Sequence, residues 1–378
     1  MSSSNVLSIP LPKFSLWEKI KNKRPLISFD LEVTARCNND CNHCYINLPA
    51  GDIGAKDQEL SLQEIDELAD EAVSLGALWC LITGGEPLLR KDFTEIYLTL
   101  KRKGLLVSVF TNANLINEDH IELFKKYPPR DIEVSVYGVT EDTYERVTKK
   151  PGTFEAFKRG LELILDNGIP LRLKAMVMRS NLSEFSEIAN FCRQYTKDYF
   201  RFDPFLHKRL DGDEFRNKGI VSERLSPQEI IFVERNDPDR SSALYNSCEK
   251  LIIPDLKSNT SRHLFQCGAG VGNATIGYNG FLRLCTSLNH PNCVYDLRKG
   301  NLIDAWHNFV PKVREMQSHR QDYLEKCNVC PLINLCIWCP AHAYLENGEL
   351  DAPVDYFCKV AHAREQEFSK HNIDEMFI

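Results

Sequence analysis

The chain of 378 residues lacks any run of 18 apolar residues, so we expect no transmembrane helix. Its N-terminus, MSSSNVLSIPLPKFSLW, lacks the positive segment and apolar stretch of a secretory signal. The chain also lacks an excess of positive charge, because 46 Lys and Arg stand against 53 Asp and Glu, a net charge of −7. This balance argues against nucleic acid or an anionic membrane as a partner.

Cysteine, in contrast, is abundant, with 14 in the chain. In a short secreted chain they would indicate disulfides, but in a chain of this size without a signal peptide they indicate metal ligands or redox thiols. Cys80 and Cys192 lie in apolar segments, and we expect both in the core. The other cysteines are the candidates for metal binding.

Strand-like and helix-like segments alternate through the first two thirds of the chain, the pattern of a parallel sheet with crossover helices. About six strand–helix units fit into about 180 residues, whereas a full eight-unit barrel needs about 250. We therefore predict an α/β fold with a partial (β/α)6 TIM-like barrel. The expected strands are 26–34, 78–83, 105–111, 132–137, 170–178 and 199–205, and the expected helices are 61–75, 92–103, 117–126, 154–165 and 183–195.

The regular pattern stops after residue 206. The stretch HKRLDGDEFRNKG is charged and contains glycine, which is typical of a linker. Further on, VGNATIGYNGFLRLC predicts a hairpin that turns at Asn279-Gly280. The predicted division is an N-terminal segment 1–25, a barrel 26–206, a linker or bridging region 207–260 and a small, metal-stapled cysteine-rich domain 261–378.

Three cysteines follow the first predicted strand in EVTARCNNDCNHCY, with the spacing C-x3-C-x2-C. They stand where parallel α/β folds place active sites. Three thiolates suit a [4Fe–4S] cluster that leaves one iron open to a small molecule. The alternative is zinc, which in structural sites is usually held by four closed ligands. The predicted ligands of the cluster are Cys37, Cys41 and Cys44.

This motif, with Tyr45 behind it, resembles the radical S-adenosylmethionine (SAM) superfamily. LITGGEPLLR, FTNAN and SVYG follow in the order in which that family carries its SAM-binding signatures. The resemblance implies reductive cleavage of SAM to a 5′-deoxyadenosyl radical, which abstracts hydrogen from a substrate. Alternatives stay open for three positions: a tight turn at Gly84-Gly85, strand packing for Ser135 and an exposed salt bridge for Arg146. The residues implied in SAM binding are Tyr45, Gly84, Gly85, Glu86, Pro87, Asn112, Ser135 and Arg146.

The C-terminal third resembles the SPASM extension of radical SAM enzymes, which carries auxiliary clusters. It departs from that pattern where Cys336 and Cys339 are separated by two residues instead of three. The alternative for these cysteines is a pair of zinc ribbons. By the family pattern one auxiliary [4Fe–4S] cluster is held by Cys327, Cys330, Cys336 and Cys358, and a second by Cys267, Cys285 and Cys339 with Cys248 or Cys293.

The resemblance leaves the substrate open. Related SPASM enzymes often modify a peptide or protein side chain, which we favour, while others act on sugars, aminoglycosides or tetrapyrroles. The residue after Cys285 is Thr286, where sulfatase-maturing relatives carry Asp, so that activity is disfavoured. Tyr137 and Asp203 at strand ends are candidate catalytic groups, with a core or capping role as the alternative. A different class of function would be a zinc-ribbon interaction module.

The resemblance also implies partners and a setting. Reduced ferredoxin or flavodoxin is the expected electron donor, and the cytoplasm is the expected compartment because exposed clusters are oxidised by air. Only 36 residues precede Cys37, so we expect no fused leader-binding domain and a separate peptide-leader-binding protein as a partner.

Overall fold

A computed structural model describes residues 24–196, 200–254 and 261–369. The central element is one nine-stranded sheet with the order β11-β10-β9-β1-β4-β5-β6-β7-β8. Its six consecutive barrel strands are all parallel, which confirms the predicted partial (β/α)6 barrel. They are β1 (Ser28–Thr34), β4 (Trp79–Gly84), β5 (Leu106–Thr111), β6 (Ile132–Val136), β7 (Leu171–Met176) and β8 (Arg201–Asp203).

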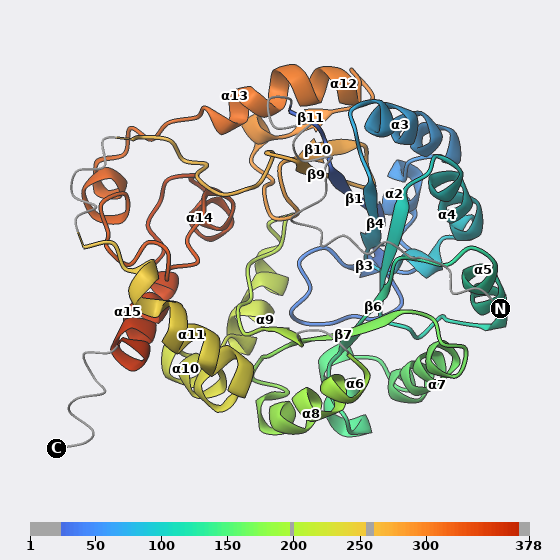
Figure 1. The fold of residues 1–378 in the computed structure, drawn as a ribbon, viewed down its shortest axis with the longest axis horizontal. Coiled ribbons are helices and arrows are strands. Elements are labelled where there is room, and N and C mark those ends of the chain that lie inside the picture. Colours follow the sequence, from blue (N-terminus) through green and yellow to red (C-terminus); the bar gives the residue numbers. More distant parts are fainter. Residues whose placement is uncertain (1–23, 197–199, 255–260, 370–378) are drawn as a thin grey trace, which may run out of the picture.

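Helices cover the outer face of this curved sheet (Figure 1). Some begin at a sequence start signal; Ser61, for example, caps α3 through the expected capping box with Glu64. The predicted helices are confirmed, while the short α2 and α6 were not expected. The helices of the barrel are α2 (Ile53–Gln58), α3 (Leu62–Ser74), α4 (Phe93–Arg102), α5 (Glu118–Lys126), α6 (Glu141–Thr148), α7 (Thr153–Asp166) and α8 (Phe185–Tyr195).

The region 207–260, expected as a linker or bridging region, contains helices that were not expected, although residues 207–213 are not helical. Three helices form in the described part of 207–260: α9 (Glu214–Glu223), α10 (Pro227–Asn236) and α11 (Pro238–Leu251). Ser226 and Glu229 form a second capping box at the start of α10. The sequence hid these helices because their outer faces are charged, and helix stability here comes from packing against the C-terminal residues.

The predicted hairpin is present and extends the barrel sheet. β9 (Asn273–Ile276) pairs in parallel with β1, and β10 (Phe281–Arg283) folds back antiparallel onto β9. Gly280 sits at the turn with a φ of +79°, a conformation that favours glycine. The cysteine-rich region is therefore continuous with the sheet through β9, β10 and β11 (Tyr295–Asp296).

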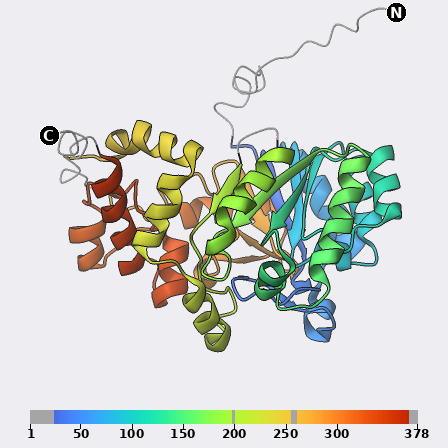
Figure 2. The same cartoon turned by 90° about the horizontal axis from the view of Figure 1, so that it is seen from below.

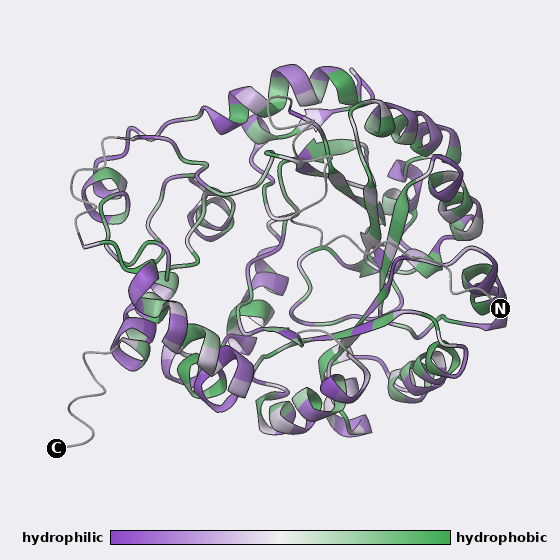
Figure 3. Cartoon of the chain, viewed as in Figure 1, coloured by the Kyte–Doolittle hydropathy of each residue, from purple (hydrophilic) through white to green (hydrophobic). Residues whose placement is uncertain are grey.

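The remaining C-terminal residues form a lobe beside the barrel (Figure 2). It contains α14 (Pro340–Asn347) and α15 (Asp355–Phe368), whereas α12 (Leu302–Asp304) and α13 (Val310–Arg314) lie along the barrel, where α12 contacts α3 (Figure 1). Figure 3 shows that the helices carry both hydrophilic and hydrophobic bands. The main core lies between the sheet and its helices and includes Cys80 and Cys192, as expected. Among the described ranges no helix combines the length and apolar character needed to span a bilayer.

Candidate active site

A cavity of about 330 Å³ lies at the carboxyl ends of the barrel strands, and we call it the barrel cavity. Parallel α/β folds place their ligands at this edge. All six barrel strands contribute to its wall, through Asp30, Leu81, Phe110, Ser135, Lys174 and Asp203. The three clustered cysteines face the same space, so the topology unites residues that are far apart in the sequence.

The cysteine loop is the segment from β2 (Arg36–Cys37) to β3 (Leu48–Pro49), and Cys37, Cys41 and Cys44 all line the barrel cavity. Backbone N–H groups are turned toward the sulfurs: Asn39 N lies 3.4 Å from Cys37 Sγ, and Asn47 N lies 3.4 Å from Cys44 Sγ. Such donors stabilise a sulfur that carries negative charge.

The thiols fit an iron–sulfur cluster rather than a single ion. Burial raises the pKa of Cys37, Cys41 and Cys44, so a bound cation is needed to hold them as thiolates. In the described part of the chain, no three His, Cys, Asp or Glu side chains converge closely enough to hold one metal ion. Three soft thiolates in one loop are a donor set that suits iron–sulfur ligation, and the cluster itself stays a prediction.

Asparagines after β5 hold the cysteine loop in place. Asn112 Nδ2 donates to Asn38 Oδ1 at 2.8 Å and lies 3.8 Å from Cys37 Sγ, while Asn114 Nδ2 donates to Asn39 Oδ1 at 3.1 Å. The FTNAN motif therefore has a visible structural role beside its predicted role in SAM binding. Asn112 itself lines the barrel cavity, where a ligand can reach it.

The glycine pair after β4 permits a close approach of two backbones. A Cβ on Gly84 would lie 2.2 Å from the Thr34 carbonyl oxygen, and one on Gly85 would lie 2.3 Å from that of Arg36. Gly84 also has a φ of +140°. Both glycines line the barrel cavity, which agrees with the predicted role of exposing backbone to a ligand.

Glu86 is fully buried behind the glycine pair and lies outside the barrel-cavity lining. Its carboxylate accepts hydrogen bonds from Thr111 Oγ1 and Asn112 N, both at 2.8 Å. Burial raises its pKa to about 7. Pro87 begins the short helix that Glu86 caps and is also outside the lining. The described contacts give both residues a role in tying β4 to β5, and their contact with SAM stays a prediction.

Three other predicted SAM-binding residues have different positions. Tyr45 and Ser135 line the barrel cavity. Arg146 does not; it projects from α6, where it pairs with Asp142 and donates to the Ser180 carbonyl at 3.3 Å. This position matches the exposed salt bridge held open as the alternative, and it gives no support to SAM binding by Arg146.

The predicted catalytic candidates both line the cavity. Tyr137 packs against His43, with ring centroids 5.2 Å apart, and Asp203 Oδ1 accepts a hydrogen bond from Phe205 N at 2.9 Å. Burial raises the pKa of Asp203 above its ordinary value.

Two charged residues of the wall were missed from the sequence. Burial and then the charge of Glu32 raise the pKa of Asp30 to about 6. Lys174 bonds Glu133 at 3.1 Å and lies over the Phe110 ring, and burial lowers its pKa to about 8. Their signal was a charge within an otherwise apolar strand.

A buried arginine from the region expected as a linker also holds the cysteine loop. Arg209 has a side-chain exposure of 1%. It donates to the Cys44 carbonyl at 3.0 Å and to Asn47 Oδ1 at 2.8 Å. Arg216, on α9, adds hydrogen bonds to Asn47 at 3.0 Å and to Asp40 at 3.0 Å. The sequence offered no periodic signal for either contact.

The C-terminal cysteines fall into the two predicted sets. Burial raises the pKa of Cys339 to about 12, and the thiols of Cys285 and Cys267 are close enough to raise it further. In the second set burial raises the pKa of Cys327 to about 12, with added contributions from its neighbours. Those neighbours are Cys336, Cys358 and Cys330. These neighbours agree with the two predicted sets, and the roles of the thiols as cluster ligands stay a prediction.

The two candidates for the missing ligand differ in location. Burial and then the Cys285 thiol raise the pKa of Cys293 to about 12, which places it beside the incomplete set. Cys248 instead packs in a separate apolar cluster, with its sulfur 4.0 Å from the Arg364 carbonyl oxygen. The structure thus brings Cys293 near the incomplete set and leaves Cys248 apart.

A buried ion pair connects the barrel to the cysteine-rich region. Glu32 on β1 pairs with Arg283 on β10, and both side chains are at most 5% exposed. Glu32 also accepts a hydrogen bond from Tyr45 Oη at 3.4 Å, and Arg283 donates to the Thr286 carbonyl at 3.2 Å. One hydrogen-bond network therefore holds both Tyr45, which follows Cys44 in the sequence, and Thr286, which follows Cys285.

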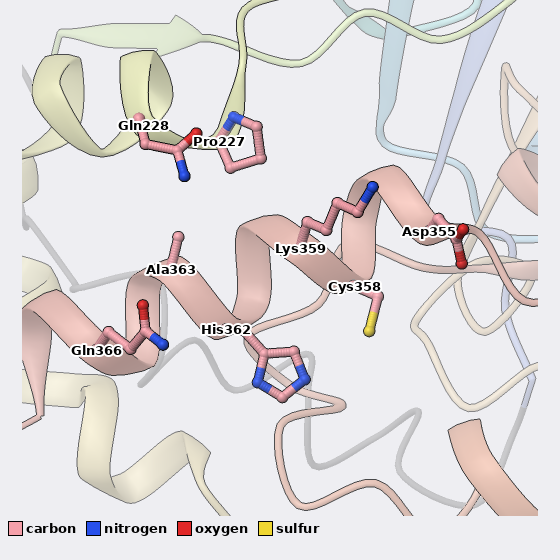
Figure 4. A pocket seen from close by; sticks show the side chains of 8 residues that line it. All are labelled: Pro227, Gln228, Asp355, Cys358, Lys359, His362, Ala363 and Gln366. Carbon is pink, nitrogen blue, oxygen red and sulfur yellow. The ribbon is translucent and has the colours of Figure 1, made fainter.

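A second hollow lies on the surface between the start of α10 and α15 (Figure 4). Cys358 and His362 point to one side of α15, away from Pro227 and Gln228. This hollow is open, and Cys358 of the Cys327 set lines it, so we assign it no separate function.

Comparisons with known proteins agree with this geometry. Residues 31–192 match the radical SAM superfamily. The chain is 32% identical to Fe-coproporphyrin III synthase of Methanosarcina barkeri, over 90% of this chain and 89% of that protein. It is 27% identical to the antilisterial bacteriocin subtilosin biosynthesis protein AlbA of Bacillus subtilis, over 82% of this chain and 66% of AlbA.

Among solved structures, Streptococcus suis SuiB bound to its precursor peptide SuiA has a TM-score of 0.67 to this chain. The match covers 95% of this chain and 84% of SuiB, at 16% sequence identity. At that identity the likeness concerns the fold, and it extends over barrel and C-terminal region together.

Proposed function

The chain belongs to the radical SAM superfamily of enzymes, and from this premise we propose that it abstracts a hydrogen atom from a peptide or protein side chain held in the barrel cavity. Membership implies a [4Fe–4S] cluster and SAM. In our proposal Cys37, Cys41 and Cys44 hold that cluster, which when bound supplies the electron that cleaves SAM to a 5′-deoxyadenosyl radical.

The chain's own residues position SAM in this proposal. The Gly84-Gly85 backbone, Asn112 and Ser135 line one side of the cavity beside the cysteine loop. Tyr45 lines the same cavity and is fixed by the buried Glu32 network. Glu86 and Pro87 would act by keeping the glycine pair against the loop. Preorganised contacts of this kind supply orientation and exclude water.

One observation carries the proposal: the three thiols share a single cavity with an ionisable wall formed by Asp30, Lys174 and Asp203. The SAM-binding signatures lie next to the cysteines, which leaves this wall for the substrate. Tyr137, packed beside His43, would shape the same part of the cavity. A cofactor side and a substrate side within one enclosed space are what radical transfer requires, because the reacting atoms must meet away from water.

The size and charge of the cavity favour a side chain over a macrocycle. Its volume of about 330 Å³ is near the lower end of the range for small-molecule sites, and SAM takes part of it. The wall carries two carboxyl groups, and its lysine is already paired with Glu133. Carboxylates opposite carboxylates are repulsive, so a polycarboxylate is a poor match for this wall.

A tetrapyrrole side chain is the second candidate. It is favoured by the 32% identity, over 90% of this chain, to Fe-coproporphyrin III synthase. The peptide candidate is supported by the 27% identity to AlbA and by the fold shared with peptide-bound SuiB. Because the likeness to SuiB concerns the fold, the choice depends on the cavity rather than on the relatives.

The C-terminal cysteines complete the proposal as two auxiliary [4Fe–4S] sites that take up electrons from the substrate. One is Cys327, Cys330, Cys336 and Cys358, and the other is Cys267, Cys285 and Cys339 with Cys293 as the nearest candidate for a fourth ligand. We further propose reduced ferredoxin or flavodoxin as electron donor and a separate leader-binding protein that presents the peptide.

The substrate test compares two panels under anaerobic conditions. Reconstituted protein, SAM and reductant are incubated either with peptides that present each side-chain type or with iron coproporphyrin III. Mass spectrometry then detects loss of hydrogen from the peptide or loss of carboxyl groups from the macrocycle. Modified peptide with unchanged porphyrin is the expected result. Modified porphyrin with unchanged peptides would refute the peptide proposal and establish the second candidate.

A further inference from the structure

His207 lies at the junction of the barrel cavity and the C-terminal lobe. It follows β8 and lines the cavity that holds the three cysteines. Its ring lies 5.5 Å from that of Tyr45 and stacks on that of His342, with centroids 5.2 Å apart and planes 24° from parallel. His342 N in turn lies 3.4 Å from Cys339 Sγ. The imidazole therefore contacts Tyr45 of the cysteine loop and His342 beside the incomplete C-terminal set.

The hydrogen bonds of this ring define which nitrogen carries the proton. Nδ1 lies 3.1 Å from the Lys208 carbonyl oxygen. A carbonyl only accepts, so Nδ1 carries the proton and donates it. Nε2 then holds a lone pair, and Ser287 Oγ is 3.5 Å away, at the limit of hydrogen bonding. Nε2 is therefore only weakly engaged, on a ring that lines the cavity.

Three polar groups of the cavity wall, Lys174, Asp203 and Thr286, are less suited to accept a proton. Lys174 is an ammonium paired with Glu133 at 3.1 Å and has no lone pair in that state. Asp203 is held by Phe205 N at 2.9 Å. Thr286 lines the same wall, but its hydroxyl group is a weak base. Asp30 and His43 also line the cavity, and His43 Nδ1 has no hydrogen-bond partner among the described residues. His207 is distinguished from them because its ring stacks on His342, whose backbone N–H reaches Cys339 of the C-terminal set.

Charges around His207 favour a cation once a proton arrives. Burial lowers its pKa, which keeps the resting imidazole neutral, while Asp203 and Glu346 act in the opposite direction. Arg224 opposes the cation, but it is itself paired with Glu346. His342 lies against the other face of the ring. Because Arg224 and Glu346 pair with each other, Asp203 is the charged neighbour that stabilises an imidazolium at His207.

We propose that His207 is the proton acceptor of a net two-electron oxidation of the substrate, an inference that rests on the proposed function. A substrate C–H bond breaks as its hydrogen atom passes to the 5′-deoxyadenosyl carbon, giving 5′-deoxyadenosine. The adjacent O–H or N–H bond then breaks, its proton goes to Nε2, and one electron passes to the iron–sulfur site of the Cys285 and Cys339 set. A C=O or C=N double bond forms, so atoms and electrons balance.

The first test replaces the base and follows two products separately. In His207→Gln, 5′-deoxyadenosine formation should stay within about twofold of the wild type, because SAM cleavage precedes proton transfer. Oxidised product should fall by about 10²- to 10⁴-fold, the usual contribution of a general base. The acid limb of the wild-type pH profile, where His207 becomes protonated, should vanish. The exposed His319→Gln is the matched control and should change neither product.

Two results with His207→Gln would overturn the proposal. A parallel fall of 5′-deoxyadenosine and oxidised product would indicate a structural role. No fall in either product would indicate that His207 has no role in the reaction. A second measurement needs no turnover. ¹⁵N spectra of histidine-labelled protein, with His207 assigned through the variant, should show a neutral ring protonated at Nδ1. A ring protonated at Nε2 would overturn the proposal. A wild-type protein that cleaves SAM but modifies no peptide would refute the proposed substrate. The ¹⁵N spectra would still show whether Nδ1 or Nε2 of His207 carries the proton.

Discussion

Replacing Arg209 by methionine should loosen the cysteine loop more than any change at the surface. The guanidinium donates to the Cys44 carbonyl and to both oxygens of Asn47, at 2.8–3.1 Å. Methionine is unbranched and apolar, is shorter than arginine and has no donors, so Cys44 loses this buried partner. Asn47 keeps its hydrogen bonds from Arg216.

The structure sets the size of the effect. A hydrogen bond from a charged donor contributes about 1.5–3 kcal/mol, and an unsatisfied buried acceptor costs about 1–3 kcal/mol. The ion pair with Asp211 adds little, because that carboxylate is 44% exposed. We therefore expect the free energy of local opening of the loop to fall by about 2–4 kcal/mol. At 1.4 kcal/mol per tenfold, that is about 30- to 700-fold faster exchange.

Hydrogen exchange followed by mass spectrometry measures this directly on peptides that span residues 36–48. Arg216→Met is the matched control: that residue is more exposed and its hydrogen bonds to Asn47 duplicate those of Arg209. The control should speed exchange by less than about tenfold, and Arg209→Lys should lie between. Exchange in Arg209→Met within about threefold of the wild type would refute the view that this arginine holds the loop.

Three further predictions concern other parts of the chain. Cys293→Ala should lower the iron bound per reconstituted chain while Cys248→Ala leaves it unchanged; the reverse order would contradict the assigned neighbour of Cys285. Gly160→Ala should lower the free energy of unfolding, measured by urea titration, by about 3 kcal/mol, because its Cβ would lie 2.0 Å from a backbone oxygen after β5. Gly219→Ala, in open space on α9, should raise that free energy by up to about 1 kcal/mol. In metal-free protein, the free energy of unfolding of the wild type relative to Asp30→Asn should be greatest below pH 4 and should decline as the pH rises to about 6. The reason is that burial raises the pKa of Asp30 in the folded state from 3.8 to about 6. Urea titrations at each pH that show no decline would contradict this.

Local signals predicted the barrel well because each unit carries its own pattern. The strand at 78–83 and the helix at 61–75 could be located from apolar periodicity and a capping box, and both lie within a residue or two of the observed elements. The cysteine loop was found by spacing alone. Its three thiols share one cavity because parallel strands end at the same edge, a rule that needs no coordinates.

What the sequence concealed were contacts made across long separations. Arg209 was assigned to a charged linker, yet its guanidinium is buried against Cys44, 165 residues away. Arg283 gave no sign of its buried pairing with Glu32. A charged residue in a charged stretch is expected to be exposed to solvent. Only the fold shows which distant partner buries it. The hairpin was predicted, but its pairing with β1 was not, because register depends on the neighbouring strand.

The residues predicted to bind SAM differ in where the fold places them, and their contacts with SAM stay predictions. Gly84, Gly85 and Asn112 lie where a ligand can reach them. Glu86 is instead occupied by donors from Thr111 and Asn112, and Arg146 is paired at the surface. A motif marks a place in the fold, whereas the partner of each side chain is decided by packing.

The most direct test of the central claim is the formation of 5′-deoxyadenosine from SAM by anaerobically reconstituted, chemically reduced protein. The account predicts that the wild type releases it and that a chain with Cys37, Cys41 and Cys44 all changed to alanine releases none. No release from a wild type that carries its full iron and sulfide, or equal release from the triple variant, would contradict the assignment of the barrel cavity as a radical SAM site.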